Sequence, residues 1–240
     1  MTPHYTVNSY NELIDVIEEL RWESIGNTLV FRGHKDATWE ITSTLNRVSG
    51  FKTCSDRKLF EQEQIRQFSV NNTEPLCVPP SNENLQAWYH LMQLQHLGCP
   101  TRLIDWSSND FIATYFATEA PDKDGAIFTI PGLCNCILSD ELEYVNPFDL
   151  PGPRMITSAV SASLGEQYPG LRNLTNQWGK FFAVPIEECH IPMEELPNCN
   201  GLIRKIVLTP AAKSDIRSSA KFNESFIYSH LAKDQLVKNL

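Results

Sequence analysis

The period of the apolar residues predicts a helix near the start of the chain. Ser9 and Glu12 form a capping box, the polar signature of a helix start. The apolar residues that follow recur at helical spacing: Leu13, Val16, Ile17 and Leu20. We therefore expect a helix over residues 10–21. The same 3.6-residue period predicts helices over residues 56–68 and 85–97.

Short apolar runs rich in β-branched and aromatic residues predict strands. These runs cover residues 28–32, 101–105, 126–130, 180–184 and 202–208. We expect the strand over 126–130 to lie beside the strand over 101–105. Residues 133–169 predict surface loops with one short helix, because prolines and glycines interrupt every candidate element. Apolar residues near helical spacing predict one or two closing helices over residues 223–240.

One segment, residues 95–117, carries polar groups that an ordinary core segment does not need. It reads as a helix end, a Gly-Cys-Pro break, a short strand with Arg102 and Asp105, and an amphipathic helix capped by Ser107. Two opposite charges on one short buried strand are costly in desolvation unless they are paired. The segment therefore either forms an internal ion pair or lines a polar cleft at the end of the strand.

Composition narrows the class of protein. The chain has 240 residues, 42% of them hydrophobic, which suffices for one domain with a sizeable core over residues 1–240. Its formal net charge is −9 and it has no run of Lys or Arg, which argues against sequence-independent binding of duplex nucleic acid. A local basic pocket is compatible with this charge.

Targeting and metal signals are missing from the pattern. The amino terminus has no basic head followed by an apolar run, and no stretch approaches the roughly 20 apolar residues of a membrane span. We therefore expect a cytoplasmic protein with no membrane partner. The seven cysteines are scattered and lack the C-x-x-C knuckle of zinc sites, so we expect reduced thiols and no metal.

Arg32 ends the predicted strand over residues 28–32, directly before Gly33 and two residues before His34. The planar guanidinium fork suits a phosphate or a carboxylate, and binding groups collect at strand ends. The alternative is structural, with Arg32 tying a loop to a buried acid such as Asp105. Both interpretations stay open.

Arg102 and Asp105 lie three residues apart on a predicted strand, so their side chains point to opposite faces and do not pair with each other. Candidate partners for Asp105 are Arg32, Arg47 and His96. An acid held between cations stays ionised and can contact a sugar hydroxyl or orient a base, but the same network can be a structural clamp. His96 is either a general base or sugar contact, or a histidine that satisfies carbonyls at a helix end.

Three further polar or aromatic residues stand where predicted elements begin or end. Trp106 either stacks on a planar ring or packs in the core. Ser107, with Asp110 three residues later, caps the next helix, and a capped helix N-terminus also binds anions. Gln177 precedes the predicted strand over residues 180–184 and is a polar group for the edge of a cleft.

Two motifs resemble the FRG domain family. The first is carried by Phe31, Arg32, Gly33, Trp39, Leu45 and Arg47, and the second by Gln95, His96, Gly98, Pro100, Thr101, Arg102, Leu103, Asp105, Trp106, Ala113, Tyr115, Phe116 and Ala117. Weaker matches are Gln177, Gly179 and Phe181, then Asn223, Glu224, Ser225 and Leu231. His34 departs from the pattern, because glutamine is usual there, and residues 133–169 match none of it.

The resemblance implies a fold and a site. The layout of the family is similar to that of ADP-ribosyltransferase-like proteins, which implies an α+β fold whose split, mostly antiparallel sheet is flanked by helices. In such proteins a first-strand arginine holds the cofactor phosphate, a middle motif shapes the nicotinamide pocket, and a late glutamate or glutamine contacts the ribose or the acceptor. The catalytic residues implied are Arg32, Asp105 and Gln177. The cofactor-binding residues implied are Arg32, Gly33, His34, Arg47, His96, Thr101, Arg102, Trp106 and Ser107.

We therefore expect an NAD-consuming ADP-ribosyltransferase-like enzyme, an effector in bacterial or phage conflict, with NAD as substrate and a protein or nucleic acid as acceptor. A glutamate would stabilise an oxocarbenium-like transition state better than Gln177. Glu119, Glu166 and Glu188 are the fallback candidates for such a catalytic glutamate. Two alternatives stay open. One is a noncatalytic sensor that binds a nucleotide or a nucleic-acid end, and the other is a protein-interaction domain whose charged network is a clamp.

Overall fold

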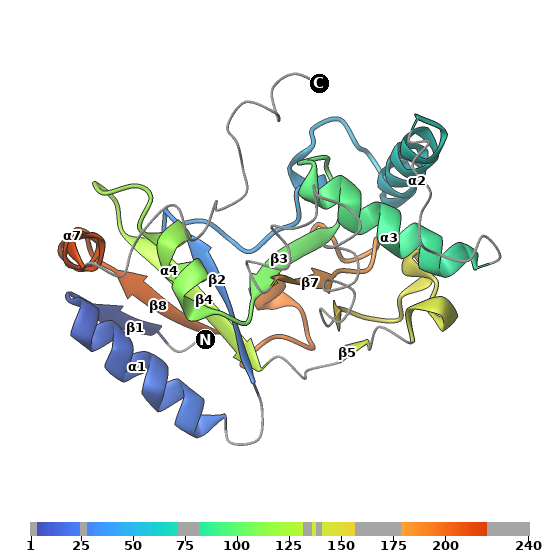
Figure 1. The fold of residues 1–240 in the computed structure, drawn as a ribbon. Coiled ribbons are helices and arrows are strands. Elements are labelled where there is room, and N and C mark those ends of the chain that lie inside the picture. The colour runs from blue at the N-terminus through green and yellow to red at the C-terminus, as the bar shows by residue number, and fades with distance from the viewer. Residues whose placement is uncertain are drawn as a thin grey trace.

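The protein is described by a computed structural model that covers residues 4–24, 28–71, 82–131, 136–137, 141–156 and 179–219. Figure 1 shows a curled sheet with one group of helices at the end that holds β1 and another beside β3 and β7. The strands are β1 (His4–Val7), β2 (Leu29–His34), β3 (Leu103–Ser107), β4 (Gly125–Pro131), β5 (Cys136–Ile137), β6 (Arg154–Ile156), β7 (Gly179–Ala183) and β8 (Arg204–Leu208). The helices are α1 (Tyr10–Glu23), α2 (Cys54–Asn71), α3 (Glu83–His96), α4 (Asp110–Ala117) and α7 (Pro210–Ser218).

The described strands form one sheet in the order β1-β8-β4-β2-β3-β7-β6-β5. Neighbouring strands pair antiparallel except β1 with β8 and β5 with β6, which are parallel. The predicted α+β fold with a mostly antiparallel sheet is confirmed. The number of paired residues varies along the sheet. β2 pairs with β4 over its whole length, whereas the described residues of β2 and β3 share the single register pair Phe31↔Ser107.

The neighbour predicted for the strand over residues 126–130 is wrong. That strand is β4, which pairs with β2 and β8, whereas β3 lies on the other side of β2. The period of apolar residues identifies a buried strand but carries no information on which strand lies beside it. Here β2, which comes early in the chain, occupies the position between them.

The helix starts follow from local capping. Ser9 caps α1 as predicted, since its Oγ accepts a hydrogen bond from Glu12 N at 3.2 Å. The predicted cap of α4 is wrong, because the side chain of Asn109, not of Ser107, accepts from Phe111 N at 2.9 Å. The strand β3 runs on through Ser107, whose Oγ instead accepts from Asn109 N at 3.0 Å.

The other predicted helices and strands agree in type and differ at their ends. The surface loops predicted over residues 133–169 include β5 and β6, which extend the sheet beyond β7 and are too short, at two and three residues, to show a period in the sequence. The strand β1 was also missed. β2 continues through Gly33 to His34, and β3 begins and ends two residues later than predicted. The helix α7 was missed although it has a standard start, in which Thr209 caps a first turn that begins with Pro210. The predicted closing helices over residues 223–240 lie outside the described residues. Across the described part of the chain, every helix is too short or too polar to span a bilayer.

The two faces of the sheet are covered differently. On one face, strand residues pack against the segment between β7 and β8. The members of this core are chiefly Val30, Ile104, Trp106, Phe128 and Phe182 from strands, with Cys189, Met193, Leu196, Cys199 and Ile203 from that segment. The opposite face has two separate helix groups, α1, α4 and α7 over β1, β8, β4 and β2, and α2 with α3 over β3, β6 and β7. The junction of β2 and β3 lies between these groups.

Gly33 lets α4 lie directly on β2. A Cβ atom at this position would overlap the carbonyl oxygen of Ala113 and the backbone nitrogen of Ala117 in α4. Backbone atoms cannot move aside as a flexible side chain would, so the close packing requires glycine.

We predict that Gly33→Ala destabilises the protein by about 3 kcal/mol or more, because α4 must move away from the sheet. Urea unfolding followed by circular dichroism measures the loss. Gly50→Ala is the control, since position 50 has open space around it and a φ of 99°, so this change costs only about 1 kcal/mol of backbone strain. Equal losses in the two variants would contradict the packing argument.

Candidate functional site

An inner cavity of about 350 Å³ lies between the two helix groups, where β2 meets β3. Its lining comes from β2 (Phe31, Arg32, Gly33), α3 (Gln95, His96), β3 (Asp105, Trp106, Ser107), α4 (Ile112, Ala113, Phe116) and β7 (Gly179, Lys180). The volume falls in the range of small-molecule sites, about 300–1,000 Å³.

An outer cavity of about 570 Å³ adjoins the inner one. It is lined by Arg32, Gly33, His34, Lys35, Trp39, Glu40, Thr42, Arg47, Phe116 and Glu119. Arg32, Gly33 and Phe116 border both cavities, so the two adjoin at these residues. We call the two cavities together the cleft. Its outer part carries the cations of Lys35 and Arg47 and the exposed ring of Trp39.

The guanidinium of Arg32 is held by two neutral acceptors. Its Nε donates to Nε2 of His34 at 2.8 Å, and its Nη1 donates to the backbone carbonyl of Asp105 at 2.5 Å. These bonds use two of its five N–H donors. Burial lowers the pKa of Arg32; the Asp105 carboxylate opposes this shift and Arg47 adds to it. Arginine remains charged at neutral pH, so the cleft holds a partly desolvated cation at its centre.

His34 is a neutral support for Arg32. Its Nε2 accepts from a guanidinium that always carries its protons, so the imidazole proton lies on Nδ1, which faces the Trp39 carbonyl at 3.4 Å. Burial and the charge of Arg32 lower the pKa of His34 to about 3. The ring is 6% exposed and packs edge-on against Phe128 and Trp39.

Asp105 presents a carboxylate to the inner cavity. Its Oδ2 accepts from Gln95 Nε2 at 2.6 Å, and the residue retains exposed surface because the cavity opens beside it. Protein atoms nevertheless surround the carboxyl group, and this desolvation raises the pKa of Asp105, with Arg32 and the Gln95 hydrogen bond opposing the shift. Of the partners predicted for Asp105, Arg32 bonds to its backbone carbonyl, and the charges of Arg32 and His96 both act to lower the pKa of its carboxyl group.

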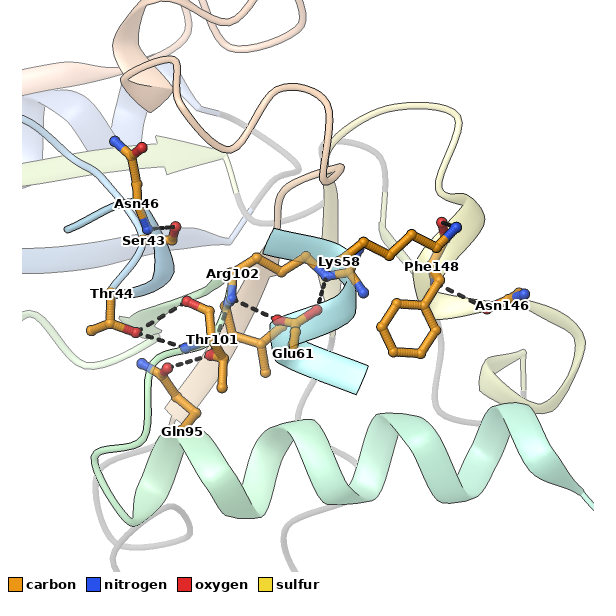
Figure 2. A network of polar contacts seen from close by, with 11 residues as sticks. Ser43, Thr44, Asn46, Lys58, Glu61, Gln95, Thr101, Arg102, Asn146 and Phe148 are labelled. Atoms are coloured by element: carbon orange, nitrogen blue, oxygen red, sulfur yellow. Dashed lines mark hydrogen bonds and ion pairs between the residues drawn. The ribbon is translucent and has the colours of Figure 1, made fainter. Parts of the chain in front are cut away.

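Arg102 lies outside the cleft, in the core behind it. Its side chain and that of Glu61 are both 0% exposed, and Arg102 Nε lies 3.1 Å from Glu61 Oε2. Glu61 Oε1 also accepts from the backbone N–H of Arg102 at 2.9 Å, and the guanidinium stacks over Phe148 at 5.0 Å (Figure 2). Burial raises the pKa of Glu61, and Arg102 opposes the shift. The prediction that Arg102 and Asp105 do not pair with each other is confirmed.

The other predicted site residues divide into two sets. Those that border the cleft are Gly33, His34, Arg47, His96, Trp106 and Ser107, together with Arg32 and Asp105. Trp106 does so while its ring packs in the core between the sheet and the segment that joins β7 to β8. Thr101 is fully buried and borders neither cavity. Gln177 and Glu166 lie outside the described residues. Of the predicted substitutes for a catalytic glutamate, Glu119 borders the outer cavity.

Two residues that bind the charged groups of this region were missed in the sequence, Glu61 in the core and Gln95 at the cleft. Glu61 lies in a helix with no clear apolar face, so its burial has no sign in the local pattern. The signal was indirect, since a buried arginine on a strand requires an acid elsewhere. Gln95 was matched to a family motif, but its contact with Asp105 depends on the break after α3, which turns the chain back beside the helix end.

Residues 27–126 match the family model described as the FRG domain. This part of the chain contains both sequence motifs and the elements β2, β3 and α4, which supply most of the cleft lining. No curated protein and no solved structure matches the chain. Within the described ranges, no group of three or more His, Cys, Asp or Glu side chains is arranged to hold a metal ion.

We predict that His34 makes the protein less stable as pH falls from 6.5 towards 3. In this window the unfolded chain binds a proton at His34 that the folded protein excludes. His34→Gln keeps an acceptor for Arg32 and removes this titration, so urea unfolding should show a wild-type slope that is steeper by about 1.4 kcal/mol per pH unit. The exposed His190→Gln variant should follow wild type. Parallel slopes for wild type and His34→Gln would rule out a buried neutral histidine.

A second prediction concerns the buried pair. Arg102→Met should cost about 3–5 kcal/mol at pH 7, because it leaves the Glu61 carboxylate buried without its cation. The double variant Arg102→Met/Glu61→Gln removes that charge and keeps a side-chain acceptor for the backbone N–H of residue 102. It should therefore be more stable than Arg102→Met alone. A raised carboxyl pKa destabilises the fold above the ordinary carboxyl range, so the two variants should converge below pH 5. Chemical unfolding that finds Arg102→Met no worse than the exposed Arg66→Met would contradict this role.

Proposed function

This chain belongs to the FRG domain family over residues 27–126, and we propose that its cleft binds NAD and cleaves the bond between nicotinamide and ribose. The observation that carries the proposal is the position of Arg32, a desolvated cation with spare donors at the junction of two adjoining cavities. A guanidinium fork suits a diphosphate, the central group of a dinucleotide. The cavities on either side provide separate room for its two halves.

The cleft has groups suited to each part of this ligand. Arg32, with Arg47 in the outer cavity, supplies positive charge for the diphosphate. The inner cavity combines the aromatic residue Phe116 with the Asp105 carboxylate, which suits a cationic nicotinamide ring and the ribose attached to it. Gln177 remains a predicted ribose or acceptor contact.

The reaction needs stabilisation of positive charge on the ribose. The bond from ribose C1′ to the nicotinamide nitrogen breaks, and its electron pair neutralises the pyridinium, which leaves as nicotinamide. The positive charge that develops over C1′ and the ring oxygen is stabilised by the ionised Asp105 on the cavity wall. Water or the hydroxyl of a macromolecular acceptor then adds to C1′ and releases a proton. Such an activity would serve an effector in bacterial or phage conflict, by depleting NAD or modifying a target.

We predict that the purified protein releases nicotinamide from NAD, measured by liquid chromatography. Arg32→Ala should lower kcat/KM on the order of 100-fold, through loss of a charge-assisted contact to the diphosphate. Asp105→Asn should lower kcat by roughly 100-fold or more with little change in KM, since its charge is needed in the transition state. Arg66→Ala is the matched control, because Arg66 is an exposed arginine paired with Glu63 on α2.

The competing function is a noncatalytic nucleotide sensor. It is favoured by Gln177, an amide where an enzyme of this kind gains from a carboxylate. The two functions separate in one pair of measurements. Turnover no greater than that of Arg32→Ala would exclude the enzyme, and a rise in Tm with NAD that Arg32→Ala abolishes would then support the sensor. Neither turnover nor a Tm shift would leave the charged network as a clamp.

A further inference from the structure

A chain of hydrogen bonds runs from the backbone of β3 to the Asp105 carboxylate. Leu103 N donates to Thr101 Oγ1 at 3.2 Å, Thr101 Oγ1 donates to Gln95 Oε1 at 2.5 Å, and Gln95 Nε2 donates to Asp105 Oδ2 at 2.6 Å. Figure 2 shows the Thr101 hydroxyl directed at the Gln95 side chain at the end of α3.

The direction of this chain is fixed by chemistry. A backbone amide can only donate, so Thr101 Oγ1 is the acceptor for Leu103 N and its single proton is available for Gln95. An ionised carboxylate can only accept, so Gln95 turns its amide nitrogen towards Asp105 and its Oε1 towards the Thr101 proton. An amide N–H donates to a carboxylate oxygen, and it cannot accept the proton of a neutral carboxyl group. The hydrogen-bond chain therefore favours the ionised form of Asp105.

The first link of the chain is held rigidly. Thr101 N donates to Thr44 Oγ1 at 3.0 Å, and Thr44 Oγ1 donates back to the Thr101 carbonyl at 3.0 Å. Leu45 N donates to the same carbonyl at 2.9 Å. Thr101 is fully buried, so the hydroxyl that orients Gln95 has no water to compete with it.

We propose that Gln95 and Thr101 are positioning residues that hold the Asp105 carboxylate in one orientation on the wall of the inner cavity. Gln95 touches Asp105 directly, and Thr101 acts on it through Gln95. This gives Thr101 a role at the site although it borders neither cavity.

The surroundings of Asp105 act on its carboxyl group in opposite directions. Arg32 from β2, His96 from α3 and Lys180 from β7 border the same cavity. The surrounding protein atoms still raise the pKa of Asp105 overall, and the hydrogen bond from Gln95 opposes this shift by stabilising the carboxylate. The catalytic purpose of the orientation rests on the proposed cleavage of NAD, whereas the hydrogen-bond chain can be tested without any substrate.

The test is a ¹³C NMR titration of the Asp105 carboxyl carbon, assigned by its loss in Asp105→Asn. Thr101→Val keeps the shape of the buried side chain but removes the hydroxyl, which frees the Gln95 amide to rotate. The proton affinity of Asp105 should then increase roughly tenfold. Gln95→Leu, at a half-buried position, should give a similar increase. Thr101→Ser restores the hydroxyl and should titrate like wild type.

Other outcomes would overturn the proposal. If Thr101→Val and Gln95→Leu fold and Asp105 titrates as in wild type, the two residues serve only to hold α3 against β3. The kinetic readout is separate: in an active enzyme, the acid limb of kcat/KM should move to higher pH in Thr101→Val and return in Thr101→Ser. Absence of NAD turnover would contradict the proposed function. The titration would still test the hydrogen-bond chain, because it needs no substrate.

Discussion

The cleft depends on the guanidinium of Arg32, which joins β2 to β3 where the register of the two strands ends. Beyond the pair Phe31↔Ser107 the backbones of these strands make no further register pair in the described sheet, and Arg32 reaches the Asp105 carbonyl with its side chain instead. A side-chain bridge leaves room that a backbone ladder would close. The same contact that holds the strands together therefore keeps a cation at the junction of two cavities.

Neutral groups make this cation available. His34 and the Asp105 carbonyl bind the guanidinium without cancelling its charge, and the pKa of His34, near 3, keeps the imidazole neutral at any physiological pH. An acid in the place of His34 would saturate Arg32 and leave a structural clamp. The core shows that arrangement nearby, where Glu61 pairs with Arg102 and both are sealed from solvent. One short segment thus supplies both a clamp, at Arg102, and a wall of the cleft, at Asp105.

Local sequence patterns predicted most of the helices and central strands, because capping and periodicity act over a few residues. The start of α1 at Ser9 is such a case. The errors concern long-range relations: β4 pairs with β2 instead of β3, and Glu61 is the partner of Arg102 from a helix about forty positions earlier. The cap of α4 moved from Ser107 to Asn109 because pairing with β7 extends β3 to Ser107, an effect of tertiary structure.

Part of the cleft lining was also predicted from the sequence. Arg32, His34 and Asp105 were identified from their places at strand ends, and the fold brings them together. Thr101 and Arg102 share the motif but border neither cavity, because Thr101 is buried against Thr44 and Gln95 and Arg102 pairs with Glu61 in the core. Which of them faces a cavity depends on α3 and α4 covering the sheet, and no local pattern carries that information.

The most direct test of the central claim is a crystal structure of the protein with ADP-ribose, the part of NAD that contains the diphosphate. We expect the diphosphate to lie within hydrogen-bonding distance of the Arg32 guanidinium, with the terminal ribose beside Asp105 in the inner cavity. A complex in which the ligand lies elsewhere, or a cleft that stays empty at saturating ligand, would contradict this expectation.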